Sequence, residues 1–180
     1  MKKKIKSFPL IHPTTIGIVG TSYNDSFNFT TIGDIAVAGL NPPLVMVSLN
    51  INHLATEYIL ASNRLSLNMP TKDMLSFVDY CGIHSGRDVD KSSIEPFEVM
   101  SGLPILKRAP IALIIQVVHT YQHKQRFICI CEVEETHIDE ELLENGKLNL
   151  SNLEMVLYGL DNHYYTSGEI IGEGYKVGKE

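Results

Sequence analysis

Two apolar segments separated by a short polar stretch constrain the fold of this chain more than any other feature. Residues 111–118 form its longest apolar run, and residues 126–133 are again mostly apolar. The polar residues 122–125 between them are typical of a turn. The pattern predicts an antiparallel β-hairpin, so we expect an antiparallel sheet.

Shorter patterns predict further strands and one loop. Strands are indicated by β-branched or apolar residues at 14–21, 32–40, 44–49 and 65–68, and the tyrosine-rich tail is expected to add a late strand. The prolines at 42 and 43 predict a turn. Residues 22–31 are largely polar and predict a loop between the first two strands.

Two short helices are also predicted. Asn50 or Asn52 would cap a helix ending at Ser62, with an inner stripe of Ala55, Tyr58 and Ile59. Thr71 would cap a second helix, whose apolar residues follow the i, i+3, i+4, i+7 pattern of a buried face. Those apolar residues are Met74, Phe77, Val78 and Cys81.

Strands dominate this pattern, and strands and helices do not alternate regularly. A doubly wound parallel sheet is therefore disfavoured, and no G-x-G-x-x-G motif follows a strand into a helix. We expect a mainly β protein, an antiparallel barrel with short peripheral helices. The 180 residues suit a single domain, with a flexible end at 1–7 and a loose tail at 172–180.

Composition excludes several classes of protein. The formal net charge of −6 argues against nucleic acid as the main partner, and no apolar run is long enough for a membrane span. Residues 7–13 contain two prolines and a histidine, unlike a signal peptide. Three cysteines fit a reducing compartment, so a cytoplasmic protein is expected. Cys129 and Cys131 would face one side of a strand, as buried small apolar residues or, less favoured, as a metal pair.

The segment from Tyr80 to Lys91 concentrates chemically useful groups. It contains two glycines, a serine, a thiol, a guanidinium and an ammonium. Such a loop can place backbone N–H groups and positive charge beside an anionic or heteroaromatic ligand. The alternative is an ordinary charged surface loop.

Two further segments suit the same kind of ligand. Residues 48–56 run from a strand into a helix start, where unpaired N–H groups, Ser48, Asn50, Thr56 and a charged His53 could hold a phosphate. The alternative is that an asparagine there only caps the helix. Residues 28–31 offer amide and hydroxyl groups to the edge of a planar ring, or form a plain surface turn.

Other chemistry finds less support. His119 and His123 share one strand face, but no third residue has suitable spacing for zinc. Cys81 and His84 provide too few ligands for a metal site. Nothing in the sequence identifies an acid that would orient His84 as the base for nucleophilic catalysis by Cys81. No G-x-S-x-G motif or carboxylate pair stands out.

Taken together, these segments resemble the flavin reductase-like family, and within it the flavoredoxin branch. The resemblance covers roughly residues 8–178. Its most specific part is the string Cys81-Gly82-x-x-Ser85-Gly86-Arg87-Asp88-x-Asp90-Lys91. The weaker parts, in family order, are Asn28-x-Thr30-Thr31, Asn41-Pro42-Pro43, Ser48-Leu49, His53-x-x-Thr56 and Asn68.

The resemblance implies a Greek-key split β-barrel that binds FMN non-covalently, usually as a homodimer with the flavin near the subunit interface. It implies that the phosphate and ribityl end is held by Ser48, Leu49, Asn50, His53 and Thr56. It places Asn28, Thr30 and Thr31 along the isoalloxazine, and completes the pocket with Cys81, Gly82, Ser85 and Lys91. Lys91 would lie near the ring or its polar edge and raise the flavin potential.

One departure concerns ring stacking. Family members often carry an aromatic residue where Ile32, Gly33 and Asp34 stand here, and the chain has no tryptophan. Stacking would then fall to Phe29 or a tyrosine, or be absent. The expected function is FMN-dependent electron transfer from NAD(P)H or a protein donor to an acceptor. A non-catalytic flavin carrier or sensor, and a structural dimer with a pocket blocked by residues such as Phe29, are the alternatives.

Overall fold

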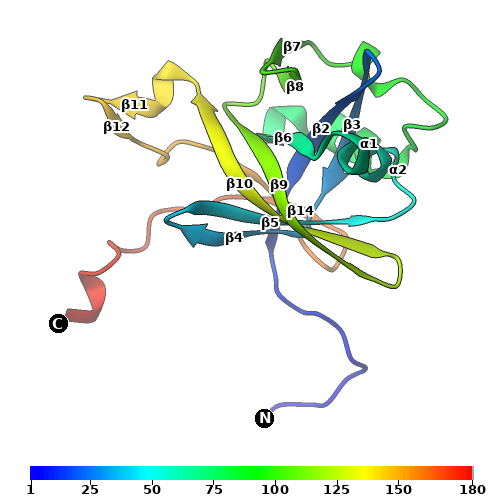
Figure 1. Ribbon diagram of the computed structural model, residues 1–180. Coiled ribbons are helices and arrows are strands. Elements are labelled where there is room, and N and C mark those ends of the chain that lie inside the picture. The colour runs from blue at the N-terminus through cyan, green and yellow to red at the C-terminus, as the bar shows by residue number, and fades with distance from the viewer. Residues whose placement is uncertain (180) are drawn as a thin grey trace.

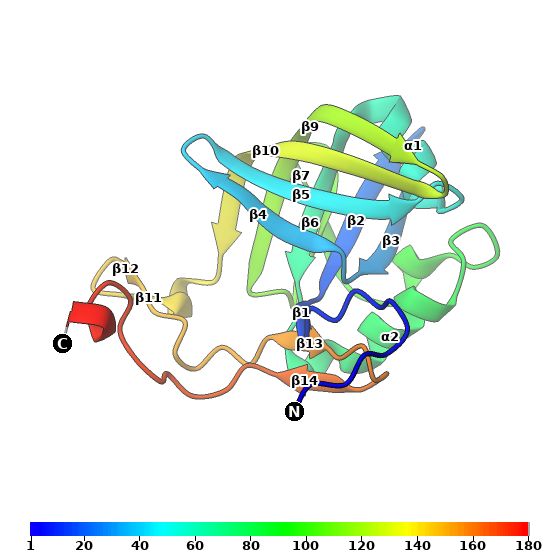
Figure 2. The same cartoon turned by 90° about the horizontal axis from the view of Figure 1, so that it is seen from below.

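Seven antiparallel strands form the main sheet of the molecule, whose computed structural model describes residues 1–179 (Figure 1). In order across the sheet they are β3 (Ser26–Ile32), β2 (Gly17–Tyr23), β6 (Arg64–Met69), β9 (Ile111–His123), β10 (Arg126–Ile138), β5 (Pro43–Asn50) and β4 (Ile35–Leu40). The edge strands β3 and β4 are separated in sequence only by Gly33 and Asp34. The sheet must therefore curl until its two edges meet, which makes a barrel (Figure 2).

Shorter elements surround this barrel. Two helices lie beside it, α1 (Leu54–Ser62) and α2 (Leu75–Ile83). Two small hairpins are β7 (Phe97–Met100) with β8 (Leu103–Leu106) and β11 (Leu143–Glu144) with β12 (Lys147–Leu148). A separate sheet joins β1 (Thr14–Thr15), β13 (Val156–Tyr158) and β14 (Tyr164–Thr166) near α2 (Figure 2). The 3-10 helices are η1 (Lys72–Met74), η2 (Lys91–Ser93), η3 (Glu140–Leu142) and η4 (Val177–Lys179).

The predicted hairpin is confirmed as β9 and β10, of 13 residues each. It is longer than expected because the polar Gln122 and His123 still pair across the strands, leaving only Lys124 and Gln125 for the turn. Lys124 has a positive φ of 51°, as two-residue hairpin turns require. The mainly antiparallel β fold follows the sequence prediction.

The loop predicted at residues 22–31 is wrong, because these residues form the β2–β3 hairpin. Its turn is Asn24-Asp25, with φ values of 48° and 59° that suit a type I′ turn. The polar residues of β3 alternate with Phe27 and Phe29, a period-2 pattern that marks a strand. The β7–β8 hairpin was not predicted from the sequence.

Both predicted helices exist, but their caps differ from the prediction. His53 occupies the N-cap of α1, and neither His53 nor Thr71 before η1 makes a side-chain capping bond. Tyr58 is only half-buried, whereas Ala55 and Ile59 are buried as expected. The predicted tail at 172–180 contains η4 and runs one residue past the described part of the chain.

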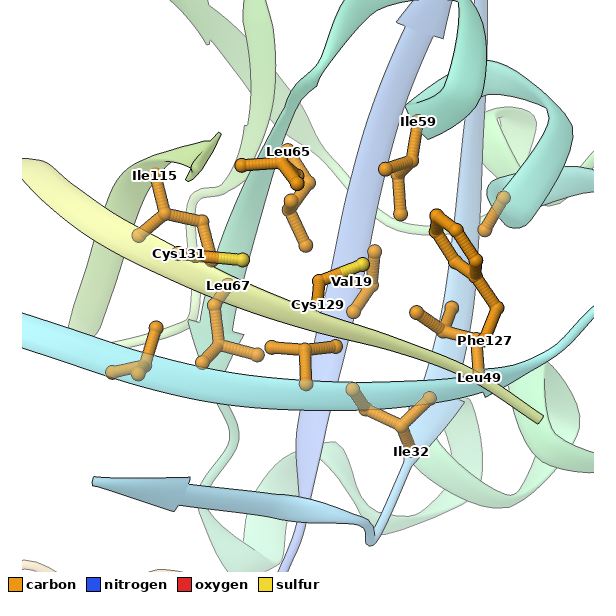
Figure 3. Packing of buried hydrophobic residues seen from close by; sticks show 14 residues of the cluster. Val19, Ile32, Leu49, Ile59, Leu65, Leu67, Ile115, Phe127, Cys129 and Cys131 are labelled. Carbon is orange, nitrogen blue, oxygen red and sulfur yellow. The ribbon is translucent and has the colours of Figure 1, made fainter. Parts of the chain in front are cut away.

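The barrel interior is filled by aliphatic side chains, Phe127 and two cysteines (Figure 3). Cys129 and Cys131 are both fully buried in this core. No group of three or more metal-ligating side chains occurs among residues 1–179. Both cysteines pack among the aliphatic side chains of the core, which supports the favoured interpretation of them as buried small apolar residues.

Replacing Cys129 by alanine should lower the free energy of unfolding by about 1–2 kcal/mol, because the lost sulfur leaves a small cavity in a packed core. Urea denaturation measures this change. Thr120 pairs with Cys129 across the hairpin and is exposed, so Thr120→Ala is the control and should change stability little. A parent protein whose stability falls on adding a chelator would contradict the apolar role.

None of the described helices is both long and apolar enough to cross a membrane.

Candidate functional site

A cavity of about 210 Å³ lies where β3, the start of α1 and the end of α2 meet, and is called here the Lys91 cavity. It is lined by Thr30, Thr31, Asn52, His53, Leu54, Cys81, Gly82, Ile83, His84, Ser85, Gly86 and Lys91. A hollow of about 290 Å³, the Asn28 hollow, adjoins it and shares Leu54, Gly86 and Lys91 with it. The three segments singled out in the sequence thus converge in space.

Seven of the twelve predicted site residues line the Lys91 cavity. They are Thr30, Thr31, His53, Cys81, Gly82, Ser85 and Lys91. Asn28 lines the adjoining hollow instead. Thr30 and Thr31 reach the cavity from a strand rather than from the predicted loop, because β3 ends there.

The other four predicted residues, Ser48, Leu49, Asn50 and Thr56, do not line the cavity. Leu49 lies in the barrel core, and the Ser48 hydroxyl accepts a hydrogen bond from Arg126 Nε at 3.2 Å. The Asn50 side chain accepts from the Asn52 backbone N–H at 3.0 Å, and the Thr56 hydroxyl donates to the Asn50 carbonyl at 2.8 Å. These contacts build the turn that carries residues 52–54 to the cavity.

Lys91 is the most unusual residue of the site. Only 2% of it is exposed, and its Nζ donates one hydrogen bond, to the Cys81 carbonyl at 3.0 Å. No ion pair within residues 1–179 involves Lys91. Burial lowers the pKa of this ammonium, since desolvation disfavours its charge. A buried ammonium with unused N–H groups beside a cavity suits an anionic or hydrogen-bond-accepting ligand.

His53 is the second unsatisfied group. Its Nδ1 is buried and has no hydrogen-bond partner in the described structure. Burial, followed by the positive charges of Lys91 and Arg126, lowers the pKa of the imidazole. The His53 ring therefore stays neutral to a lower pH than a free histidine does, which limits the positive charge in the cavity.

Replacing His53 by glutamine should make stability less dependent on pH below 6.5. Between the lowered pKa of folded His53 and 6.5, the unfolded chain binds more protons, so stability rises with pH across this window. Removing the imidazole removes this slope, which for one proton cannot exceed about 1.4 kcal/mol per pH unit. Urea denaturation of the ligand-free protein at several pH values measures it. His119→Gln, on the exposed part of β9, is the control, and an unchanged slope for the His53 variant contradicts the assignment.

The thiol of Cys81 is not set up as a nucleophile. Burial raises its pKa to about 12, so the thiolate is scarce at neutral pH. The ring of His84 lies against that of Tyr80, with their centroids 4.1 Å apart and their planes tilted by 37°. Cys81 therefore contributes shape and its carbonyl, which holds Lys91.

The glycine-rich segment is only partly a loop. Residues 80–83 form the last turn of α2, so the predicted loop begins at His84. Arg87 ties the loop to α1 through an ion pair with Glu57 at 2.8 Å. A Cβ added to Gly86 would lie 2.0 Å from the Asn28 side-chain oxygen, so only glycine fits this close approach. Asn28 and Gly86 thus set the distance between β3 and the loop.

Sequence reasoning missed five residues that line the cavity. They are Asn52, Leu54, Ile83, His84 and Gly86. All five lie within two of the three predicted segments, residues 48–56 and 80–91. Their position in these segments was the signal that could have identified them. Phe29 was wrongly considered for ring stacking or for blocking the pocket. It is fully buried and packs edge-on against Phe77 and Phe97.

A family model described as "Flavin reductase like domain" matches residues 10–166. The chain belongs to the flavin reductase-like family. No curated protein sequence matches it. Family membership confirms the predicted resemblance and supports a flavin-related redox function.

Several solved structures are similar to this chain over almost its whole length. Flavoredoxin from Methanosarcina acetivorans has a TM-score of 0.94 at 28% identity, covering 99% of this chain and 98% of that one. Flavoredoxin of Desulfovibrio vulgaris (Miyazaki F) has a TM-score of 0.91 at 24% identity, covering 99% and 100%. An FMN-binding protein from Thermus thermophilus has a TM-score of 0.83 at 22% identity, covering 96% and 97%. They confirm the predicted split-barrel fold.

A flavin is the cofactor that the family implies, and the Lys91 cavity has features that fit one. Lys91 Nζ has the Cys81 carbonyl as its hydrogen-bond partner but no ion pair, and the buried His53 Nδ1 has no partner in the described structure. Hydroxyls of Thr30 and Ser85 and the bare backbone of Gly82 also border the cavity. Anionic and hydrogen-bonding groups of a flavin nucleotide would complete this set of donors and acceptors.

Proposed function

We propose that this protein binds FMN non-covalently in the Lys91 cavity and passes electrons through it, from NAD(P)H or a protein donor to an acceptor. The observation that carries this proposal is the burial of Lys91 without a counter-ion beside a cavity. Such a charge destabilises a protein unless a ligand compensates it, so it supports a binding role. When bound, the flavin supplies the redox chemistry at its isoalloxazine ring.

The chain's own residues would bind and tune the cofactor. His53 and the N-terminus of α1 would hold the phosphate, while Thr30, Thr31, Cys81, Gly82 and Ser85 would line the rest. The Lys91 ammonium would stabilise negative charge on the ring or its polar edge and raise its potential. Ser48, Leu49, Asn50 and Thr56 would act by positioning the turn before α1, and Asn28 by setting the width of the site.

The size of the site supports a ligand that extends beyond the Lys91 cavity. Ligand pockets usually measure about 300–1,000 Å³, and the Lys91 cavity alone measures about 210 Å³. The Asn28 hollow of about 290 Å³ adjoins it and shares Leu54, Gly86 and Lys91 with it. An FMN molecule would therefore reach from the Lys91 cavity into the Asn28 hollow.

We also propose a single-domain homodimer that works in the cytoplasm. On the edge strand β4, Val37 is 71% exposed and Leu40 is 86% exposed, which supports burial of these side chains against a second copy of the chain. Analytical ultracentrifugation tests the assembly.

The proposed location in the cytoplasm is supported by the three cysteines, which are all free thiols and suit a reducing compartment.

The direct test is a visible absorption spectrum of the purified protein, followed by an FMN titration monitored by flavin fluorescence. We expect the purified protein to be yellow, or to be colourless and to quench the fluorescence of FMN added in an equimolar amount. Protein that stays colourless and ignores FMN overturns the proposal. Anaerobic addition of NADH and NADPH then distinguishes an enzyme from a flavin carrier or sensor, because only the enzyme bleaches the bound flavin.

A further inference from the structure

The hollow of about 480 Å³ beside the Lys91 cavity is not explained by flavin binding alone, and is called here the Tyr158 hollow. It is lined by Thr14, Ile16, Thr31, Gly33, Asp34, Asp79, Gly82, Ile83, Tyr158, Leu160, Asn162 and Tyr164. The small β1–β13–β14 sheet forms one side of it, and α2 forms another. Thr31, Gly82 and Ile83 border both spaces, so a ligand in one contacts residues of the other.

The two spaces differ in charge. The Lys91 cavity is lined by Lys91, His53 and His84 and by no carboxylate. The Tyr158 hollow is lined by Asp34 and Asp79 and by no lysine, arginine or histidine. Arg126 neutralises Asp34 by an ion pair, whereas Asp79 forms none among residues 1–179. The uncompensated charge of the hollow is therefore that of Asp79.

The hollow also supplies the aromatic surface that the Lys91 cavity lacks. The rings of Tyr158 and Tyr164 lie 5.3 Å apart at an angle of 57°. The Tyr158 hydroxyl donates to the Asn162 side chain and the Tyr164 hydroxyl to Asp79, each at 2.8 Å. Burial and then this bond to Asp79 raise the pKa of Tyr164, so its hydroxyl stays a donor at neutral pH. Both rings are thus held in place at the wall of the hollow.

We propose that the Tyr158 hollow is the docking subsite for the small redox partner of the bound flavin, and that it takes an uncharged or cationic aromatic molecule in preference to an anionic one. Tyrosine faces attract cations, and the Asp79 carboxylate repels anions. This inference rests on the proposed function, because the partner docks against a flavin in the adjoining cavity.

Two aromatic probes of opposite charge test the preference. Methyl viologen, a dication, and anthraquinone-2,6-disulfonate, a dianion, are titrated into the oxidised FMN-bound protein in air. Binding is followed by calorimetry and by the change in the visible flavin spectrum, so the readout is independent of turnover. We expect methyl viologen to bind at least about ten-fold more tightly, with a difference that narrows as salt is added.

Variants locate this binding. Asp79→Asn removes the charge but keeps an oxygen that can accept from Tyr164, so it should weaken viologen binding about five-fold and strengthen disulfonate binding. Tyr158→Leu removes one aromatic face and should weaken viologen binding about ten-fold. Asp25→Asn is the charge-matched control. Asp25 precedes β3, and Thr31 at the hollow lies six residues further along the strand, about 20 Å away at about 3.3 Å per residue. This substitution should change neither affinity.

The possible outcomes separate the two proposals. Tight FMN binding with equal affinities for the two probes, or with Asp79→Asn no different from Asp25→Asn, overturns the docking inference and leaves FMN binding intact. A protein that does not bind FMN overturns both. Charge preference that disappears in the Asp79 variant, with unchanged FMN affinity, supports the inference.

Discussion

Replacing Lys91 by methionine should weaken FMN binding about 30- to 150-fold, the equivalent of a charge-assisted hydrogen bond of about 2–3 kcal/mol. The same change should leave the ligand-free protein at least as stable as the parent. Methionine fills similar space, and removing an unpaired buried charge offsets the lost bond to the Cys81 carbonyl. A fall in affinity without a fall in stability is the mark of a residue retained for binding.

FMN affinity is measured by fluorescence titration and ligand-free stability by urea denaturation. Because burial lowers the pKa of Lys91, the unfolded chain binds more protons between that pKa and 10.5, so parent stability rises with pH across this alkaline window. The Lys91→Met variant should lack this rise. Lys107→Met, at an exposed lysine, is the matched control. Unchanged FMN affinity would remove Lys91 from the site.

Replacing Gly86 by alanine should reduce FMN affinity by about 100-fold or more, through shape rather than charge. The new Cβ would lie 2.0 Å from the Asn28 side-chain oxygen and 3.3 Å from Leu54 Cδ2. Asn28 is buried and its amide donates to the Thr30 hydroxyl at 3.3 Å, so it cannot easily move aside. The loop would shift instead, and a 1 Å displacement in a binding site can cost about 100-fold.

A double-mutant cycle tests this steric cause. Asn28→Ala removes the clashing oxygen, so the Gly86→Ala substitution should cost much less in that background, giving a clear coupling between the two positions. Gly168→Ala is the control, because a Cβ there meets nothing within 4 Å. Equal costs of Gly86→Ala in both backgrounds would show that the clash with Asn28 is not the cause.

Local patterns in the sequence were enough to predict much of the fold. The apolar runs of β9 and β10, the buried stripe of α2 and the lack of strand–helix alternation led to an antiparallel barrel with peripheral helices. The β2–β3 hairpin was missed because composition was given more weight than periodicity. Residues 22–31 are polar on average, yet Phe27 and Phe29 alternate with polar neighbours as strand residues do. Which edges of the sheet meet depends on long-range pairing that no local pattern encodes.

The site was predictable as a set of segments but not as a set of contacts. The positively charged and hydroxyl-bearing residues of the three segments predicted that they share one ligand. The structure brings seven of the predicted residues to one cavity. Burial of Lys91 could not be inferred from its charged neighbours, since it depends on how η2 packs against β3. Ser48, Asn50 and Thr56 carry polar groups that suit a ligand, but these groups are used within the turn before α1.

The seam of the barrel has a consequence for how the protein moves. The chain crosses from one sheet edge to the other through only Gly33 and Asp34, and the Ser48 amide bonds to the Asp34 carbonyl at 2.9 Å beside this crossing. Thr31, two residues earlier, borders both the Lys91 cavity and the Tyr158 hollow. A local opening of the barrel at this crossing would displace a wall of both spaces. We therefore expect a ligand in either space to slow amide hydrogen exchange at Ser48.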